Sequence, residues 1–187
     1  MFGLGWALLQ SAAAATLLVS HDGASDFRTV QGAIDAASDG DIISVGAGEW
    51  NESLDFGGKS LTLRGASQSD TIIDGQGEFD QLIKADQGEN LRIESLTLSN
   101  SYHRGIIVEG GSIEADDVLF WDLGSLEHFG GAIGAQNADI SITNSRFFEN
   151  FAYDGGAIHA SGSMSIFIEN TDFESNRGTG YTEEVRE

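Results

Sequence analysis

The chain has 187 residues with 25 glycines, no proline and no cysteine, and its net charge at pH 7 is −21. This length is typical of one domain with a continuous core, and the lack of cysteine excludes disulfides and thiolate metal sites. The negative charge disfavours nucleic acids and anionic membrane surfaces, because their phosphates would be repelled.

The first 20 residues carry no charged side chain. An apolar start is followed by the small residues Ser11 to Ala15, which are typical of a signal-peptidase cleavage site. We therefore expect residues 1–15 to be a signal-peptide remnant, residues 16–187 to be the folded domain, and the protein to be extracellular or at the cell surface, the outer membrane included. A transmembrane helix is the alternative, but Gln10 and Ser11 interrupt a stretch that would need about 20 apolar residues.

A short amphipathic helix is predicted next. Ser25 or Asp26 would cap it, and it would run through about Ser38 before Gly40 ends it. Its apolar face would consist of Phe27, Val30, Ile34 and Ala37. We expect this helix to cap the first coil of a solenoid, whose core and strand edge would otherwise be open.

Short alternating segments then follow one another with no further helical pattern. The predicted coils are 39–58, 59–88, 89–111, 112–137, 138–162 and 163 onward. The apolar residues expected to point inward are Ile43, Val45, Leu61, Leu63, Ile72, Leu82, Ile93, Leu96, Leu98, Ile107, Ile113 and Val118.

Two motifs recur near the end of the chain. Gly130-Gly131-Ala132-Ile133 returns as Gly155-Gly156-Ala157-Ile158, 25 residues later. Phe147-Phe148-Glu149-Asn150 returns as Phe173-Glu174-Ser175-Asn176, 26 residues later. A period of this size with short strands indicates β-solenoid coils, and two unrelated hairpins are the weaker interpretation.

Each repeated residue has a predicted role in such coils. The glycine pairs suit a tight turn before a strand. Phe147 and Phe173 are expected to stack inside the core, as are the alternating isoleucines that follow each turn. Asn150 and Asn176 would occupy equivalent turns, where stacked amides can hydrogen-bond from coil to coil.

These repeats resemble those of polymorphic outer-membrane proteins. The stretch from Phe27 to Gly77 resembles the opening of β-helices of the pectin-lyase-like superfamily. The resemblance implies an all-β fold, a right-handed single-stranded parallel β-helix of about six coils with an N-terminal capping helix. It implies little about activity, since this scaffold carries lyases, hydrolases, adhesins and inert spacers.

Loops that follow equivalent strands should gather along one edge of the solenoid. Aromatic rings beside polar groups are what sugar recognition uses, and ordinary loop decoration is the alternative. The candidate ligand-binding residues are Tyr102, His103, Arg104, Trp121, Glu127, His128, Tyr153 and Asp154.

Catalytic and metal-binding patterns are weak. Asp116-Asp117 resembles the paired aspartates of β-helix polysaccharide hydrolases, but the companion Asn-Thr-Asp, Gly-His-Gly and Arg-Ile-Lys motifs are absent. Asp74 is interpreted as a turn former and Lys59 as part of a structural Gly-Lys pattern. The four histidines lack metal-ligand spacing, so no metal site is predicted. Calcium stays open as a cofactor, because the acidic lyases of this superfamily hold it on clustered carboxylates.

The leading hypothesis is therefore a secreted or cell-surface β-helix segment, not an enzyme, that serves adhesion or glycan contact. One alternative is a polysaccharide lyase or hydrolase, and another is a structural spacer without a ligand. A glycan or cell-surface polysaccharide is the expected partner. No second cap is recognisable, so we expect the same β-helix to continue beyond residue 187.

Overall fold

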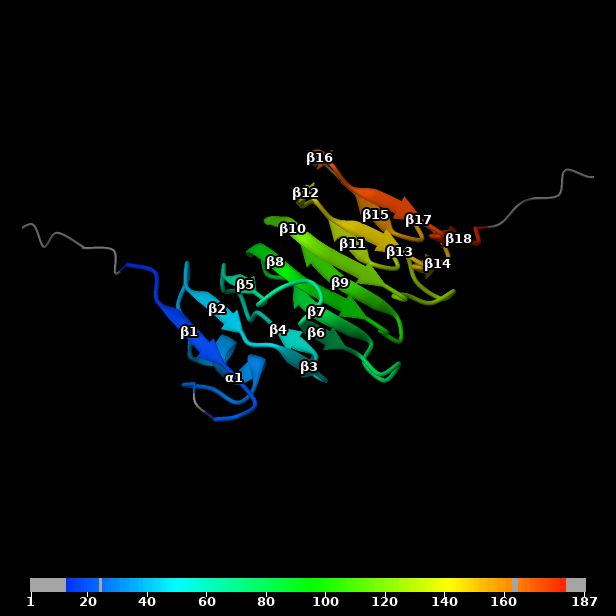
Figure 1. Cartoon of the computed structure of the whole chain (residues 1–187). Helices are drawn as coiled ribbons and strands as arrows, with labels where there is room; N and C mark the ends of the chain where they lie inside the picture. The colour runs from blue at the N-terminus through cyan, green and yellow to red at the C-terminus, as the bar shows by residue number, and fades with distance from the viewer. Residues whose placement is uncertain (1–12, 24, 163–164, 181–187) are drawn as a thin grey trace, which may run out of the picture.

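Parallel strands wind as successive coils through a computed structural model of the protein (Figure 1). The structure describes residues 13–23, 25–162 and 165–180. It forms an all-β parallel solenoid of about six turns with very little helix, as predicted. The predicted signal peptide lies largely outside the described residues.

The strands of successive coils line up on three faces. The first face is built from β1 (Thr16–Val19), β2 (Ile42–Val45), β5 (Thr62–Arg64), β8 (Asn90–Ser99), β10 (Ser112–Trp121), β12 (Asp139–Thr143) and β16 (Ile166–Glu169). The second face combines the distal halves of β8 and β10 with β3 (Gly48–Trp50), β6 (Thr71–Asp74), β13 (Arg146–Phe148) and β17 (Asp172–Glu174). The third face is built from β4 (Leu54–Asp55), β7 (Gln81–Ala85), β9 (Arg104–Glu109), β11 (Ile133–Gln136) and β15 (Ile158–Ser161). A last pair joins β14 (Phe151–Ala152) to β18 (Arg177–Gly178).

The core lies between these faces and consists of stacked side chains. Equivalent positions pair in register, so each inward residue lies on its counterpart in the next coil. The rings of Phe120, Phe147 and Phe173 form one such column, with centroids 4.4 Å and 4.7 Å apart and nearly parallel planes. The predicted inward position of Phe147 is confirmed by its complete burial.

Two of the residues predicted to point inward do not do so. Ile73 and Ile106 are fully buried, whereas their neighbours Ile72 and Ile107 are only half-buried. Where two isoleucines are adjacent, the sequence pattern does not show which of them points into the core. The register decides it, because Ile73 pairs with the buried Leu98.

The predicted coil boundaries coincide with turns. All five boundary residues have positive φ, namely Gly58, Gly88, Gly111, Asn137 and Gly162. Glycine and asparagine tolerate this left-handed region best, which is why the boundaries can be read from the sequence. Close packing adds a second constraint at Gly111, where a Cβ would lie 2.0 Å from the Glu89 carbonyl oxygen.

The two repeated asparagines form the predicted ladder. Asn150 is fully buried, and its Oδ1 accepts a hydrogen bond from the Leu123 amide at 3.1 Å. Its Nδ2 donates to the Phe120 carbonyl at 3.0 Å and to Asn176 Oδ1 at 2.8 Å. Asn176 Nδ2 repeats the pattern by donating to the Phe147 carbonyl at 2.8 Å. The amides therefore tie three successive coils together.

The helix α1 (Val30–Ala36) is shorter than predicted. Thr29 caps it, and its side chain accepts a hydrogen bond from the Gly32 amide, so the prediction of Ser25 or Asp26 as the cap was wrong. The reason is that Phe27 pairs with β1 through backbone hydrogen bonds and cannot join the helix. Val30, Ala33 and Ile34 are buried against the first coils.

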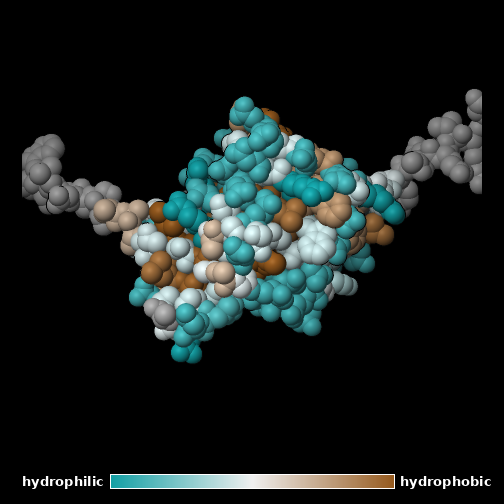
Figure 2. All heavy atoms as spheres, viewed as in Figure 1, coloured by the Kyte–Doolittle hydropathy of each residue, from teal (hydrophilic) through white to brown (hydrophobic). Residues whose placement is uncertain are grey.

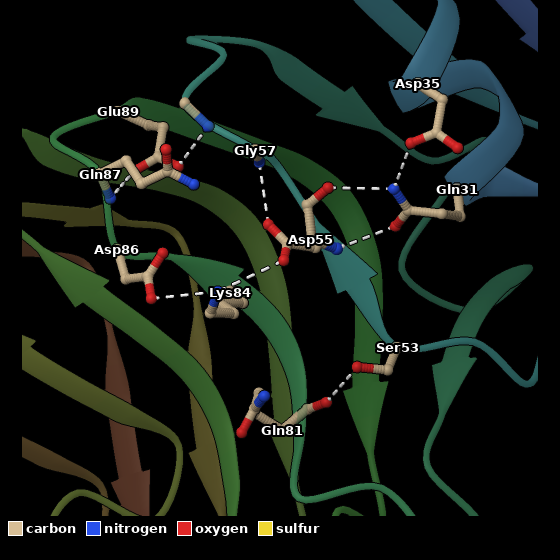
Figure 3. A network of polar contacts seen from close by, with 11 residues as sticks. Gln31, Asp35, Ser53, Asp55, Gly57, Gln81, Lys84, Asp86, Gln87 and Glu89 are labelled. Carbon is tan, nitrogen blue, oxygen red and sulfur yellow. Dashed lines mark hydrogen bonds and ion pairs between the residues drawn. The ribbon is translucent and has the colours of Figure 1, made fainter.

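Polar contacts join the helix to the third face (Figure 3). Gln31 exchanges two hydrogen bonds with the backbone of Asp55, at 2.8 Å and 3.0 Å. Lys84 forms ion pairs with Asp55 and Asp86, at 3.3 Å and 3.1 Å. Lys59 donates to the carbonyls of Ile34 and Asp35 at the end of α1, a structural role that fits its sequence interpretation.

Apolar side chains are exposed at the last described coil. Phe173 is 48% exposed although it continues the phenylalanine column, because no described coil lies beyond it. Figure 2 shows apolar spheres at this end of a largely hydrophilic surface. The prediction that Phe173 is buried like Phe147 was wrong within the described chain. In residues 13–23, 25–162 and 165–180, no helix is long and apolar enough to cross a membrane.

Candidate functional site

A groove runs across the outer surface of the third face. Two hollows of about 240 Å³ and 250 Å³ meet there, and Arg104 and Ile107 line both. We call this region the Arg104 groove. Besides those two residues, the polar and aromatic side chains that line it are Asp80, Gln81, His103, Glu109, His128, Phe129, Gln136, His159 and Ser161.

The repeated glycine pairs shape one edge of the groove. Gly130 and Gly155 have φ values of 72° and 64°, and a Cβ on Gly131 would lie 2.2 Å from the Gly156 carbonyl oxygen. Only glycines allow two successive loops to stack this closely. The stacking places Phe129 against Tyr153, with ring centroids 5.6 Å apart.

Arg104 lies at the centre of the groove without an acceptor. Its guanidinium makes no hydrogen bond and no ion pair with the described residues, and its Nε is buried. Gly134 lies beside this side chain, and a Cβ there would only make an ordinary van der Waals contact with Arg104 Cδ, at 3.6 Å. Lys84, on the same face, is already neutralised by its two aspartates. Arg104 is therefore the cation of this face that is left for a ligand.

Three histidines surround the arginine. His103 Nδ1 lies 3.2 Å from Asp80 Oδ1, and the ring of His103 meets that of His128 edge to face at 4.2 Å. His159 lies on the other side, with its ring centroid 5.0 Å from that of Phe129. The aspartate fixes the orientation of the His103 ring, as carboxylates do for histidines in reactive sites.

The electrostatics of the groove keep His128 neutral near pH 7. Burial lowers the pKa of the His128 imidazole below its usual value, and His103 and Arg104 lower it further. Burial likewise lowers the pKa of Arg104, against the opposing charge of Glu109. Arginine stays protonated in proteins, so the groove combines a fixed cation with a neutral proton acceptor.

The structure brings together six of the eight predicted ligand-binding residues. His103, Arg104 and His128 line the groove. Tyr102, Tyr153 and Asp154 contact its rings, since Tyr102 lies against His103, Tyr153 against Phe129 and Asp154 beside His159.

Trp121 and Glu127 were also predicted to lie along this edge of the solenoid. Glu127 is exposed and lines neither hollow. Trp121 is not in the loop, because β10 extends through it and pairs it with Phe148 on the second face. The prediction that Trp121 lies along the same edge of the solenoid as the histidines was therefore wrong.

Sequence reasoning missed Asp80, Gly134, Gln136 and His159 as groove residues. Gly134 and His159 occupy the same register position in successive coils. The repeated Gly-Gly-Ala-Ile motif contained this signal, because the residue after each isoleucine points outward on this face.

The aspartate pair has a structural role. Asp116 accepts hydrogen bonds from Thr143 Oγ1 at 2.6 Å and from Asn144 Nδ2 at 2.7 Å, and both bonds lower the pKa of its carboxyl group. Asp117 has a φ of 56° at the corner of β10. Asp74 accepts from the Gln76 amide at 2.6 Å, which agrees with its interpretation as a turn former.

Comparisons with known proteins identify the fold. No family model matches the sequence, and no curated protein is similar to it. Among solved structures, pectin methylesterase PemA from Erwinia chrysanthemi is 16% identical, with 88% of this chain and 55% of that chain covered and a TM-score of 0.61. A pectin methylesterase in complex with a hexasaccharide is 17% identical, with 93% and 58% covered and a TM-score of 0.61.

The chain has the β-helix fold of these esterases. The predicted pectin-lyase-like fold is thereby confirmed. This chain spans little more than half the length of either esterase. The resemblance to polymorphic outer-membrane proteins, the handedness and the capping role of α1 stay predictions.

Proposed function

We propose that this chain processes an acidic polysaccharide that binds along the Arg104 groove. The similarity in fold to pectin methylesterases, one of them in complex with a hexasaccharide, supports this proposal. It favours the polysaccharide lyase or hydrolase alternative over the adhesion hypothesis. We further propose that the protein acts outside the cell, where such polysaccharides occur.

The observation that carries the proposal is the guanidinium of Arg104, which has no hydrogen bond or ion pair within the described part of the chain and lies in a hollow rich in histidines. A guanidinium binds a carboxylate with two parallel hydrogen bonds, and burial strengthens both. Phe129 offers a ring for the C–H face of a sugar. A uronate unit therefore suits Arg104 through its carboxylate and Phe129 through its sugar ring, and the carboxylates of Asp80 and Glu109 beside them leave a role for a bridging cation.

The groove also has the groups that uronate chemistry needs. A neutral imidazole such as that of His128 can take a proton, from water in a hydrolysis or from the sugar ring in an elimination. The guanidinium stabilises the negative charge that develops beside the carboxylate in an elimination, or on the oxyanion when water attacks an ester. His103, whose orientation is fixed by Asp80, would hold the ring of His128 in place.

Calcium would reduce the repulsion between the acidic chain and its ligand. The described residues contain no group of three or more acidic or histidine side chains that would hold a metal ion alone. We propose that calcium bridges carboxylates of the ligand and of the protein. Binding that a chelator leaves unchanged would exclude this role.

Arg104→Met is expected to weaken the binding of polygalacturonate about 10- to 150-fold, because a charge-assisted hydrogen-bonded pair contributes about 1.5–3 kcal/mol. Isothermal titration calorimetry measures the affinity. Arg146→Met is the matched control, since Arg146 pairs with Glu174 on the second face and should leave binding unchanged. Equal affinities of the wild type and the Arg104 variant would contradict the proposed function.

The affinity for polygalacturonate is expected to rise as the pH falls from about 7.5 to about 5.5, a range that brackets the ordinary pKa of histidine. The pKa of His128 is lowered in the free protein, and a bound carboxylate raises it again, so binding takes up a proton. The uronate itself stays ionised in this range. His128→Asn should reduce the slope of affinity against pH, and a slope unaffected by this substitution would show that His128 does not face the ligand.

A further inference from the structure

Another hollow lies beside the loop between Gly124 and Gly130, which contributes Leu126 to its lining. Its volume is about 350 Å³, and its lining residues are Leu126, Glu149, Phe151, Ser175 and Arg177. None of them lines the Arg104 groove. The two concavities are therefore separate sites.

The aromatic side chains of Trp121 and Phe148 lie next to this hollow. The Trp121 side chain is 42% exposed, and its Nε1 donates a hydrogen bond to Glu149 Oε2 at 3.4 Å. Phe148 lies beside Trp121 in register on the neighbouring strand. The hydrogen bond anchors the indole at the rim, and Leu126 and Phe151 continue the apolar surface into the hollow.

The charges in the hollow balance locally. Glu149 and Arg177 are its two charged residues, and they form no ion pair with each other. The carboxylate accepts hydrogen bonds from hydroxyl groups, and the guanidinium donates them. An anionic ligand would gain little here, because the carboxylate of Glu149 offsets the charge of Arg177 within the same hollow.

We propose that this hollow binds a neutral hexose unit. A pyranose ring has an apolar C–H face for Trp121 or Phe151 and hydroxyl groups at its edge for Glu149 and Arg177. The volume falls within the range of about 300–1,000 Å³ that is common for small-molecule pockets. The site is independent of the acidic-polysaccharide function proposed for the Arg104 groove.

Tryptophan fluorescence tests the proposal directly. The chain contains three tryptophans, of which Trp50 is buried and stacked on His21 at 3.7 Å. Trp6 lies outside the described residues, so the assay uses a Trp6→Phe background. Cellohexaose and (1→4)-galactohexaose are the neutral probes. We expect at least one of them to give a saturable blue shift of the Trp121 emission.

Variants assign that signal to the hollow. Glu149→Gln and Phe151→Leu should each weaken binding by about fivefold or more. The first removes a carboxylate oxygen that accepts a hydrogen bond from a sugar hydroxyl, the second removes an apolar contact, and either loss costs on the order of 1 kcal/mol. Arg104→Met should leave it unchanged. No shift with either sugar, a shift that neither variant alters, or a response to a galacturonate hexamer alone would each overturn the proposal. These outcomes do not depend on polygalacturonate binding in the other groove.

Discussion

Phe147→Ala is expected to lower the free energy of unfolding by about 3–5 kcal/mol, as truncations of buried aromatic residues do. Phe147 is fully buried and stacks between Phe120 and Phe173, so its removal opens a cavity in the middle of the column. The strands on either side are paired in register and cannot move together to fill it. Chemical denaturation followed by circular dichroism measures the change.

Phe173→Ala provides the matched control. The sequence repeat treats Phe147 and Phe173 as equivalent, and on that basis both substitutions would cost the same. Phe173 is about half exposed in the structure and stacks on one side only. Its loss should therefore cost less than half as much. Equal costs would mean that a further layer covers Phe173 in the folded protein.

Asn150→Ala is expected to destabilise the fold by about 2–4 kcal/mol, because it leaves a buried donor and a buried acceptor without partners. These are the amide of Leu123 and the carbonyl of Phe120. Both lie at the corner where the loop towards the Arg104 groove begins. Thermal and denaturant unfolding measure the loss.

Asn176→Ala tests whether the two asparagines of the ladder contribute equally to stability. Asn176 is half-buried and satisfies the Phe147 carbonyl as well as the amide groups of Asn150. We expect a smaller loss than for Asn150→Ala, since water can reach the freed groups at the last described coil. A larger loss than for Asn150 would contradict this view of the ladder.

Much of the fold could be predicted because turns and strands use different residues. Glycine and asparagine at positions such as Gly88 and Asn137 mark left-handed turns, so the coil boundaries follow from the sequence. The direction of adjacent apolar residues does not follow in this way. Ile72 and Ile73 are identical in chemistry, and only the register with β8 places Ile73 inside.

The candidate site was predictable only in part. Equivalent loops do gather, which brings His103, His128 and Tyr153 together as the period implies. The end of β10 was not predictable, and Trp121 is its last residue and pairs with Phe148 on the second face. Arg104 has no hydrogen-bond partner among the described residues because of where side chains of several coils lie, which no local pattern contains.

The Arg104 groove crosses successive coils, since Arg104, Gly134 and His159 lie on β9, β11 and β15. In a solenoid each coil contacts only its neighbours, so coils near an open end can detach with little effect on the rest. A ligand that bridges these strands adds its binding energy to the docking of the outer coils. Ligand affinity and the cooperativity of unfolding are therefore coupled, and hydrogen exchange at β15 should slow when the groove is filled.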